Sequence, residues 1–126
     1  MMRTIGTIAL CAAFLACSSS AAQAARPPKG KFKIVIAVKN GPTRGATLHC
    51  SPDSGTHPHP RAACDVVRKV GGDLTRIHVP ADSGCGLEVK PYAVMITGTW
   101  RGKKVQWSKG YRNFCAMQAA AGKLLS

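Results

Sequence analysis

Residues 32–38 are Phe32-Lys33-Ile34-Val35-Ile36-Ala37-Val38, a β-branched run that predicts a strand. The run is followed by Asn40-Gly41-Pro42, which predicts the start of a turn. Residues 46–50, Ala46-Thr47-Leu48-His49-Cys50, resume a strand pattern. The two runs together predict a hairpin with a longer loop near the start of the chain.

An apolar face at helical spacing comes next. Ala63, Val66, Val67 and Val70 stand at i, i+3, i+4 and i+7, which predicts a short helix that ends at Gly71-Gly72. Between the hairpin and this helix, residues 51–60 carry three prolines and predict a loop. The helix therefore follows the first strands after an irregular connection.

Further strands and a second helix are predicted in the C-terminal half. Residues 92–100 and 104–107 predict two strands joined by a turn at Arg101-Gly102, and residues 114–121 predict a helix stopped by Gly122. Residues 73–88 are mostly loop. The order of strands, helix, long loop, strands and helix predicts an α+β fold with the helices on one face of a sheet.

Length and charge exclude several classes of protein. The chain has 126 residues, which suit one domain but are too few for two cores. Its 18 Lys and Arg against five Asp and Glu give a formal charge of +13. No apolar run reaches the roughly 18 residues of a transmembrane helix. The dispersed acids and the lack of a Gly-x-Ser-x-Gly motif predict neither catalysis nor a cofactor.

The first 24 residues have the three-part layout of a secretory signal peptide. Arg3 gives a positive start, residues 5–16 are mostly apolar, and Ala22-Gln23-Ala24 is a cleavage site. Cleavage after Ala24 predicts a secreted protein of charge about +12, with a basic, Pro-rich mobile arm over residues 25–31 and one domain over residues 32–126. A lipidated Cys17 is the alternative, disfavoured because Leu15 stands two residues before it rather than three.

Six cysteines in a short exported chain indicate disulfides. Removal of the signal peptide leaves Cys50, Cys64, Cys85 and Cys115, which allow three connectivities. Pairing of neighbours gives Cys50–Cys64 and Cys85–Cys115. A structural zinc site is disfavoured, because neither C-x-x-C nor H-x-x-x-H spacing occurs.

Three stretches together resemble one family of secreted proteins. They are Thr47-Leu48-His49-Cys50-Ser51-Pro52-Asp53-Ser54-Gly55-Thr56-His57-Pro58, then Val70-Gly71-Gly72-Asp73-Leu74, and then Trp100-Arg101-Gly102-Lys103-Lys104-Val105 with Asn113-Phe114-Cys115-Ala116-Met117. With the order and spacing of the cysteines, they are similar to the Streptomyces subtilisin inhibitor family of serine-protease inhibitors. The resemblance runs from about residue 32 to the C-terminus.

The resemblance implies a fold and a function. The implied fold is a five-stranded antiparallel sheet with two helices, dimeric through the sheet, with disulfides Cys50–Cys64 and Cys85–Cys115. The implied function is inhibition of a subtilisin-like, or chymotrypsin-like, serine endopeptidase, not enzymatic activity. Leu87 would be the primary specificity residue and Leu87–Glu88 the scissile bond. The implied reactive loop comprises Cys85, Gly86, Leu87, Glu88, Val89 and Lys90. The alternative for Leu87 is an ordinary core position.

Two features depart from the family. Gly86 stands where the family often has proline, which gives the loop more freedom. The charge is also high, and it supports an alternative function: a cationic secreted protein that binds a polyanion or cell-surface partner without inhibiting. The bases that could form one basic face are Lys31, Lys33, Lys39, Arg44, Arg101, Lys103, Lys104, Lys109 and Arg112.

Two further motifs have simple interpretations. Trp100 and Trp107 stand among bases, as aromatic residues do in nucleic-acid platforms. Strand aromatics favour a core or a dimer interface, so no nucleic acid is expected as a partner. His57-Pro58-His59 has neither an evident third ligand nor a paired carboxylate, which disfavours a metal site. The family resemblance implies that it is a structural loop before the first helix.

Overall fold

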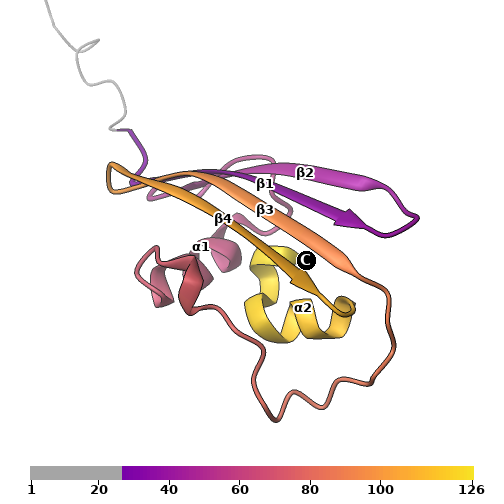
Figure 1. Ribbon diagram of the computed structural model, residues 1–126. Coiled ribbons are helices and arrows are strands. Elements are labelled where there is room, and N and C mark those ends of the chain that lie inside the picture. Colours follow the sequence, from indigo (N-terminus) through magenta and orange to yellow (C-terminus); the bar gives the residue numbers. More distant parts are fainter. Residues whose placement is uncertain (1–26) are drawn as a thin grey trace, which may run out of the picture.

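The computed structural model describes residues 27–126 (Figure 1). The signal peptide expected over residues 1–24 and the lipid attachment considered at Cys17 lie outside the described residues. The helices and strands are β1 (Gly30–Val38), β2 (Thr43–Cys50), α1 (Pro60–Lys69), the 3₁₀ helix η2 (Leu74–Arg76), β3 (Tyr92–Trp100), β4 (Lys103–Tyr111), α2 (Phe114–Ala121) and the 3₁₀ helix η3 (Gly122–Leu125).

The sheet is antiparallel, with the strand order β2-β1-β3-β4. Strand β1 is central, so Ile34 lies between Ala46 of β2 and Ile96 of β3. All four strands predicted from local patterns are confirmed. Because β1 begins at Gly30, the last two residues of the arm expected over residues 25–31 belong to the strand.

The sheet has four strands within residues 27–126, so the expectation of a five-stranded sheet is wrong. Local patterns predicted four strands, and the fifth came only from the resemblance. Residues 77–91, between η2 and β3, form a loop outside the sheet. Pro80 and Pro91 lack the N–H that a ladder needs, and Gly84 has a positive φ of 71°, so this segment is poorly suited to a strand.

One face of the sheet is covered by the helices and the other is open. Phe32, Ile34 and Ile36 alternate along β1 and are buried, whereas Lys31 and Lys33, at the alternate positions, are exposed. Both α1 and α2 lie on the face with the buried side chains (Figure 1). The predicted arrangement, with the helices on one face of the sheet, is therefore confirmed.

The two tryptophans belong to the core. Trp100 is buried and stacks on Phe32, with 6.2 Å between the ring centroids. Trp107 is half-buried and packs against the same core. The core interpretation of these aromatic residues is confirmed.

Helix α1 follows the predicted pattern from its start to its end. Pro60 occupies its first turn, and Ala63 and Val67 of the apolar face are buried. The chain leaves the helix through Gly71 and Gly72, whose φ angles are 63° and 80°. A Cβ on Gly72 would also lie only 2.2 Å from the indole of Trp100, so no other residue fits there. No helix within residues 27–126 is long and apolar enough to cross a membrane.

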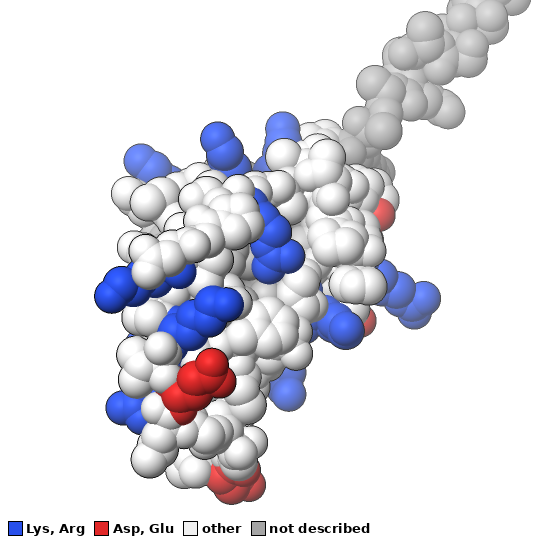
Figure 2. Space-filling model, turned by 90° about the vertical axis from the view of Figure 1, so that its right-hand side faces the viewer, with Lys and Arg blue, Asp and Glu red and all other residues white. Residues whose placement is uncertain are grey.

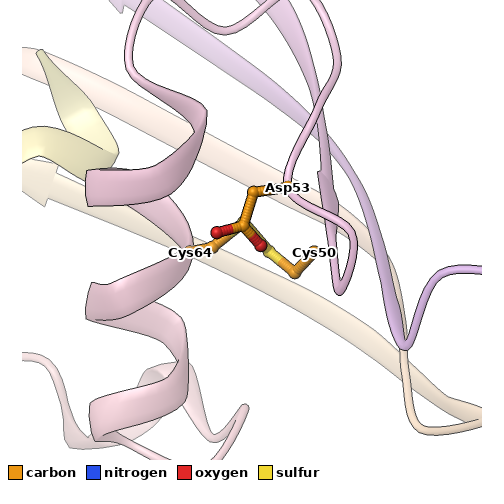
Figure 3. Close-up of side chains that lie close together, drawn as sticks. All are labelled: Cys50, Asp53 and Cys64. Carbon is orange, nitrogen blue, oxygen red and sulfur yellow. A yellow bond between two sulfur atoms is a disulfide. The ribbon is translucent and has the colours of Figure 1, made fainter.

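The disulfide between Cys50 and Cys64 joins the end of β2 to α1, with 5.6 Å between the Cα atoms. The carboxylate of Asp53 lies beside it (Figure 3). The two sulfurs are bonded to each other and offer no thiolate to a metal. Asp53 instead accepts two hydrogen bonds from Arg68, both at 2.9 Å, which hold the pKa of its carboxyl below the ordinary value. This group is a structural link between β2, its following loop and α1.

His57 has a structural role in the loop before α1. Its ring is buried, and Nδ1 accepts a hydrogen bond from the backbone N–H of His59 at 2.9 Å. Since Nδ1 is an acceptor, Nε2 carries the hydrogen and donates to the carbonyl of Leu124 at 3.0 Å. The ring thus connects this loop to η3, and both its nitrogens are occupied, which supports the structural interpretation.

The basic residues of the strands do not form the single face expected from the sequence. Lys31 alternates with the buried residues of β1 and lies on the open face. Arg44 and Lys103 pair with the buried Ile36 and Trp100, and therefore lie on the opposite face. The expectation failed because strand alternation sends nearby bases to opposite sides of the sheet.

Candidate functional site

The candidate site is the segment Cys85–Lys90, within the long loop that passes below α2 and returns to β3 (Figure 1). Leu87 is 81 % exposed and Val89 is 70 % exposed, more than any other large apolar side chain among the described residues. Leu87 is therefore not a core residue. Two highly exposed apolar side chains within three residues of one loop mark the segment as a candidate binding element.

A disulfide fixes the N-terminal side of this segment. Cys85 is bonded to Cys115 in the first turn of α2, with 5.7 Å between the Cα atoms. Both disulfide pairings implied by the family resemblance are therefore confirmed. The covalent link holds the chain two residues before Leu87 against the helical layer.

Asn113 holds the chain on both sides of Leu87. Its side-chain Nδ2 donates to the carbonyl of Gly86 at 3.1 Å and to the carbonyl of Glu88 at 2.8 Å. Its Oδ1 accepts from the backbone N–H of Ala116 at 2.8 Å and caps α2. Asn113 is only 6 % exposed, so its side chain is fixed in the fold, whereas Gly86 and Glu88 are exposed. The Leu87–Glu88 bond thus lies between two carbonyls held by one amide.

Asn113 is the site residue that the sequence interpretation missed. The residue stood in a stretch that carried the family resemblance but was given no role. A signal was present: an asparagine in front of a predicted helix is a preferred N-cap. Its cap uses only Oδ1, so the two amide hydrogens remain available to other acceptors.

The C-terminal side of the segment is joined to the sheet. The backbone N–H of Lys90 donates to the carbonyl of Arg112 at 2.8 Å, and that of Lys39 donates to Pro91 at 3.0 Å. The rings of Tyr92 and Phe114 pack at 5.8 Å between centroids. The segment is therefore supported at both ends, whereas nothing lies within 4 Å of a Cβ built at Gly86.

This geometry defines a class of protein: a small disulfide-linked domain that presents one peptide bond on a supported, exposed loop. The side chains around that bond, Leu87, Glu88, Val89 and Lys90, include no serine, threonine, cysteine or histidine. The loop can therefore offer a peptide bond to an enzyme.

Comparisons with known proteins give the family. The model of the subtilisin inhibitor-like family matches residues 34–113, and this chain belongs to that family. The subtilisin inhibitor of Streptomyces violaceus is 33% identical over 140 residues, which cover 98% of this chain and 96% of that protein. Subtilisin inhibitor-like protein 4 of Streptomyces lavendulae is 37% identical over 86 residues, 68% of this chain and 74% of that protein. The family is one of protease inhibitors, not of enzymes.

A solved structure agrees in fold. It is Streptomyces caespitosus sermetstatin in complex with Bacillus licheniformis subtilisin, with a TM-score of 0.59 and 28% identity. The match covers 75% of this chain and 96% of the sermetstatin chain. The α+β architecture is thus shared along nearly all of that inhibitor.

Proposed function

We propose that this protein is a secreted inhibitor of subtilisin-like serine endopeptidases. It binds its target through Cys85–Lys90, with Leu87–Glu88 as the scissile bond. The observation that carries the proposal is the 81 % exposed Leu87 beside a bond whose flanking carbonyls are both held by Asn113. Relatives named as subtilisin inhibitors, and a fold shared with an inhibitor in complex with subtilisin, support it.

In the proposed mechanism the loop binds as a substrate does, and Leu87 enters the specificity pocket of the protease. When the protease serine attacks the Leu87 carbonyl, the amine of Glu88 is the leaving group. Asn113 retains the Glu88 side, and the Cys85–Cys115 disulfide keeps the Leu87 side joined to α2. The amine stays next to the acyl group, so the bond re-forms faster than water hydrolyses it. A supported loop also has less conformational entropy to lose on binding.

Gly86 does not leave the loop unsupported. The residue lies between the disulfide at Cys85 and the exposed Leu87, and its carbonyl is bonded to Asn113. These two constraints compensate for the freedom that glycine adds relative to the proline common in the family. We therefore expect inhibition rather than rapid cleavage.

Leu87 sets the proposed specificity. A large apolar side chain suits the pockets of subtilisin-like and chymotrypsin-like proteases, whereas a trypsin-like pocket requires a cation. The alternative function, a cationic binding protein without inhibitory activity, is not favoured, since the relatives are named as inhibitors and the loop has the geometry of a presented bond.

Secretion and dimerisation belong to the same proposal. The signal-peptide pattern of residues 1–24 and the two disulfides support an extracellular protein. The proposed homodimer forms through the open face of the sheet, where Met95 is 54 % exposed next to the half-buried Val35. Sedimentation of the mature protein tests this, because a monomer at micromolar concentration contradicts it.

The function is tested by titrating the mature protein against subtilisin and chymotrypsin. We expect stoichiometric inhibition. Mass spectrometry after long incubation is expected to find slow cleavage at Leu87–Glu88 alone. No inhibition of either enzyme, or rapid cleavage at several bonds, would show that the proposal is wrong.

Asn113→Asp is expected to convert the inhibitor partly into a substrate. The variant keeps an oxygen to cap α2 but loses both N–H donors to Gly86 and Glu88. Two lost hydrogen bonds of about 1 kcal/mol each predict about 30-fold faster hydrolysis of the Leu87–Glu88 bond. The measurement is the rate of loop cleavage by catalytic amounts of subtilisin.

Asn113→Ala is the matched control, because it removes the helix cap as well. Its melting temperature should fall below that of Asn113→Asp, while its loop is cleaved at a similar rate. If Asn113→Asp is cleaved as slowly as the unsubstituted protein, the two carbonyl contacts have no part in inhibition.

A further inference from the structure

Three exposed cations lie at the end of the sheet that supports the proposed reactive loop. We name Lys39, Lys90 and Arg112 the basic rim. Val38, Tyr92 and Tyr111 form one row across β1, β3 and β4. Lys39 directly follows β1, Arg112 directly follows β4, and Lys90 lies two residues before β3. Figure 2 views the molecule from this side and shows many more Lys and Arg than Asp and Glu side chains.

Backbone contacts fix the spacing of the basic rim. The backbone N–H of Lys39 donates a hydrogen bond to the carbonyl of Pro91 at 3.0 Å, and that of Lys90 donates to the carbonyl of Arg112 at 2.8 Å. Neighbouring strands lie about 4.8 Å apart, so the Cα atoms of Lys39 and Arg112 are about 10 Å apart, with the chain at Lys90 and Pro91 between them. Lys90 is the last residue of the segment Cys85–Lys90 and lies two residues after Glu88. The basic rim therefore lies next to the C-terminal side of the Leu87–Glu88 bond.

The basic rim borders a concave surface. A shallow hollow is lined by Lys39, Asn40, Val89, Lys90 and Pro91. Lys90 also lines a second hollow together with Arg44. A protruding loop of a bound partner that carries a carboxylate would therefore meet at least two cations and the exposed Val89.

The protein itself does not neutralise these cations. Within residues 27–126 the ion pairs involve only Arg68, which pairs with Asp53 and Asp65. All five acids of the chain fall between residues 53 and 88, and the strands contain none. Like charges on neighbouring segments repel one another, and an acidic partner relieves this repulsion.

We propose that the basic rim binds an acidic surface of the target protease, on the side of its cleft that receives the residues after the scissile bond. The inference rests on the proposed inhibitory function and narrows its target to proteases with carboxylates at that position. Leu87 and the supported loop provide the anchor, while the rim selects among proteases with similar specificity pockets and accelerates encounter.

The test compares two triple variants that lose the same charge. The rim variant is Lys39→Gln/Lys90→Gln/Arg112→Gln. The control variant is Lys31→Gln/Lys103→Gln/Lys104→Gln, at the opposite end of β1 and β4. Lys31 and Lys39 are eight residue steps apart along β1, or about 26 Å, well beyond the Debye length of about 10 Å at 0.1 M salt. All six side chains are exposed, so both variants should fold, which circular dichroism checks.

The probes are two subtilisin-like proteases, one with an acidic and one with a basic surface around the cleft. At 0.1 M salt we expect the rim variant to associate with the acidic protease about 5-fold more slowly than the unsubstituted protein, with a weaker dependence on salt. The control variant should stay within about 1.5-fold, since its bases are screened. With the basic protease, the rim variant should associate faster than the unsubstituted protein.

The outcomes separate this inference from the proposed function. If both triple variants associate with the acidic protease at the same rate, the inference is wrong while the inhibitory function stands. If the unsubstituted protein inhibits neither protease, the proposed function fails and the inference fails with it.

Discussion

Leu87→Ala is expected to raise the inhibition constant for a subtilisin-like protease by about 10- to 150-fold. The leucine side chain is 81 % exposed in the free protein, and its burial in a specificity pocket contributes about 1.5 to 3 kcal/mol. The melting temperature should not change, because the side chain has no role in the core of the free protein. Inhibition kinetics and thermal unfolding of the same preparation measure the two quantities.

Val79→Ala is the matched control for Leu87→Ala. Val79 is also an exposed apolar residue in the long loop, 37 % accessible, but it lies outside the segment Cys85–Lys90. Its removal should change neither inhibition nor stability. Equal inhibition by the Leu87→Ala and unsubstituted proteins would show that the reactive bond has been misplaced.

Removal of the Cys85–Cys115 disulfide is expected to give the second large effect. In Cys85→Ala/Cys115→Ala the chain on the Leu87 side of the bond is no longer tied to α2. The acyl group and the amine of Glu88 then separate more readily, so subtilisin should hydrolyse the bond at least about 10-fold faster. Without the disulfide the unfolded chain is less restricted. In the chain-entropy model, the free energy of unfolding should therefore fall by roughly 3 to 4 kcal/mol. Cleavage followed by mass spectrometry and denaturant unfolding measure both changes.

Cys50→Ala/Cys64→Ala separates stability from loop support. This disulfide closes a shorter loop, with a sequence separation of 14, and joins β2 to α1, neither of which is linked by a disulfide to the reactive segment. Its removal should lower stability by roughly 3 kcal/mol, yet the folded fraction should inhibit as before. If the two double variants are cleaved equally fast, loss of stability alone explains the cleavage, and the disulfide at Cys85 has no specific role.

Local patterns predicted most of the secondary structure because they depend on near neighbours in the chain. The β-branched run of β1 and the helical spacing of Ala63, Val66 and Val67 each specify one element. Gly71-Gly72 predicted the end of α1, since a left-handed backbone favours glycine. The contact that excludes a Cβ at Gly72, with the indole of Trp100, is visible only in the fold.

The wrong expectations concerned features that depend on how strands far apart in the sequence pair with one another. The fifth strand came from resemblance alone, and the four strands supported by local patterns are those that formed. The interpretation of the bases as one basic face was wrong, because the strand register decides which side of the sheet each base occupies. The pairing of Arg44 with the buried Ile36 shows this. The disulfides were not among the errors: spacing alone left three connectivities, and the fold confirms the pairing that the family resemblance implied.

For the candidate site, the sequence determined which residues are present and, through the family resemblance, which bond to examine. The tertiary structure decided how that bond is held. Asn113 contacts Glu88 and Gly86 across 25 and 27 residues, and Lys39 meets Pro91 across the ends of β1 and β3. Such contacts depend on the pairing of the strands and on the direction of the first turn of α2. No local sequence pattern encodes them. The chemistry of the loop is therefore local, whereas its rigidity is a property of the whole fold.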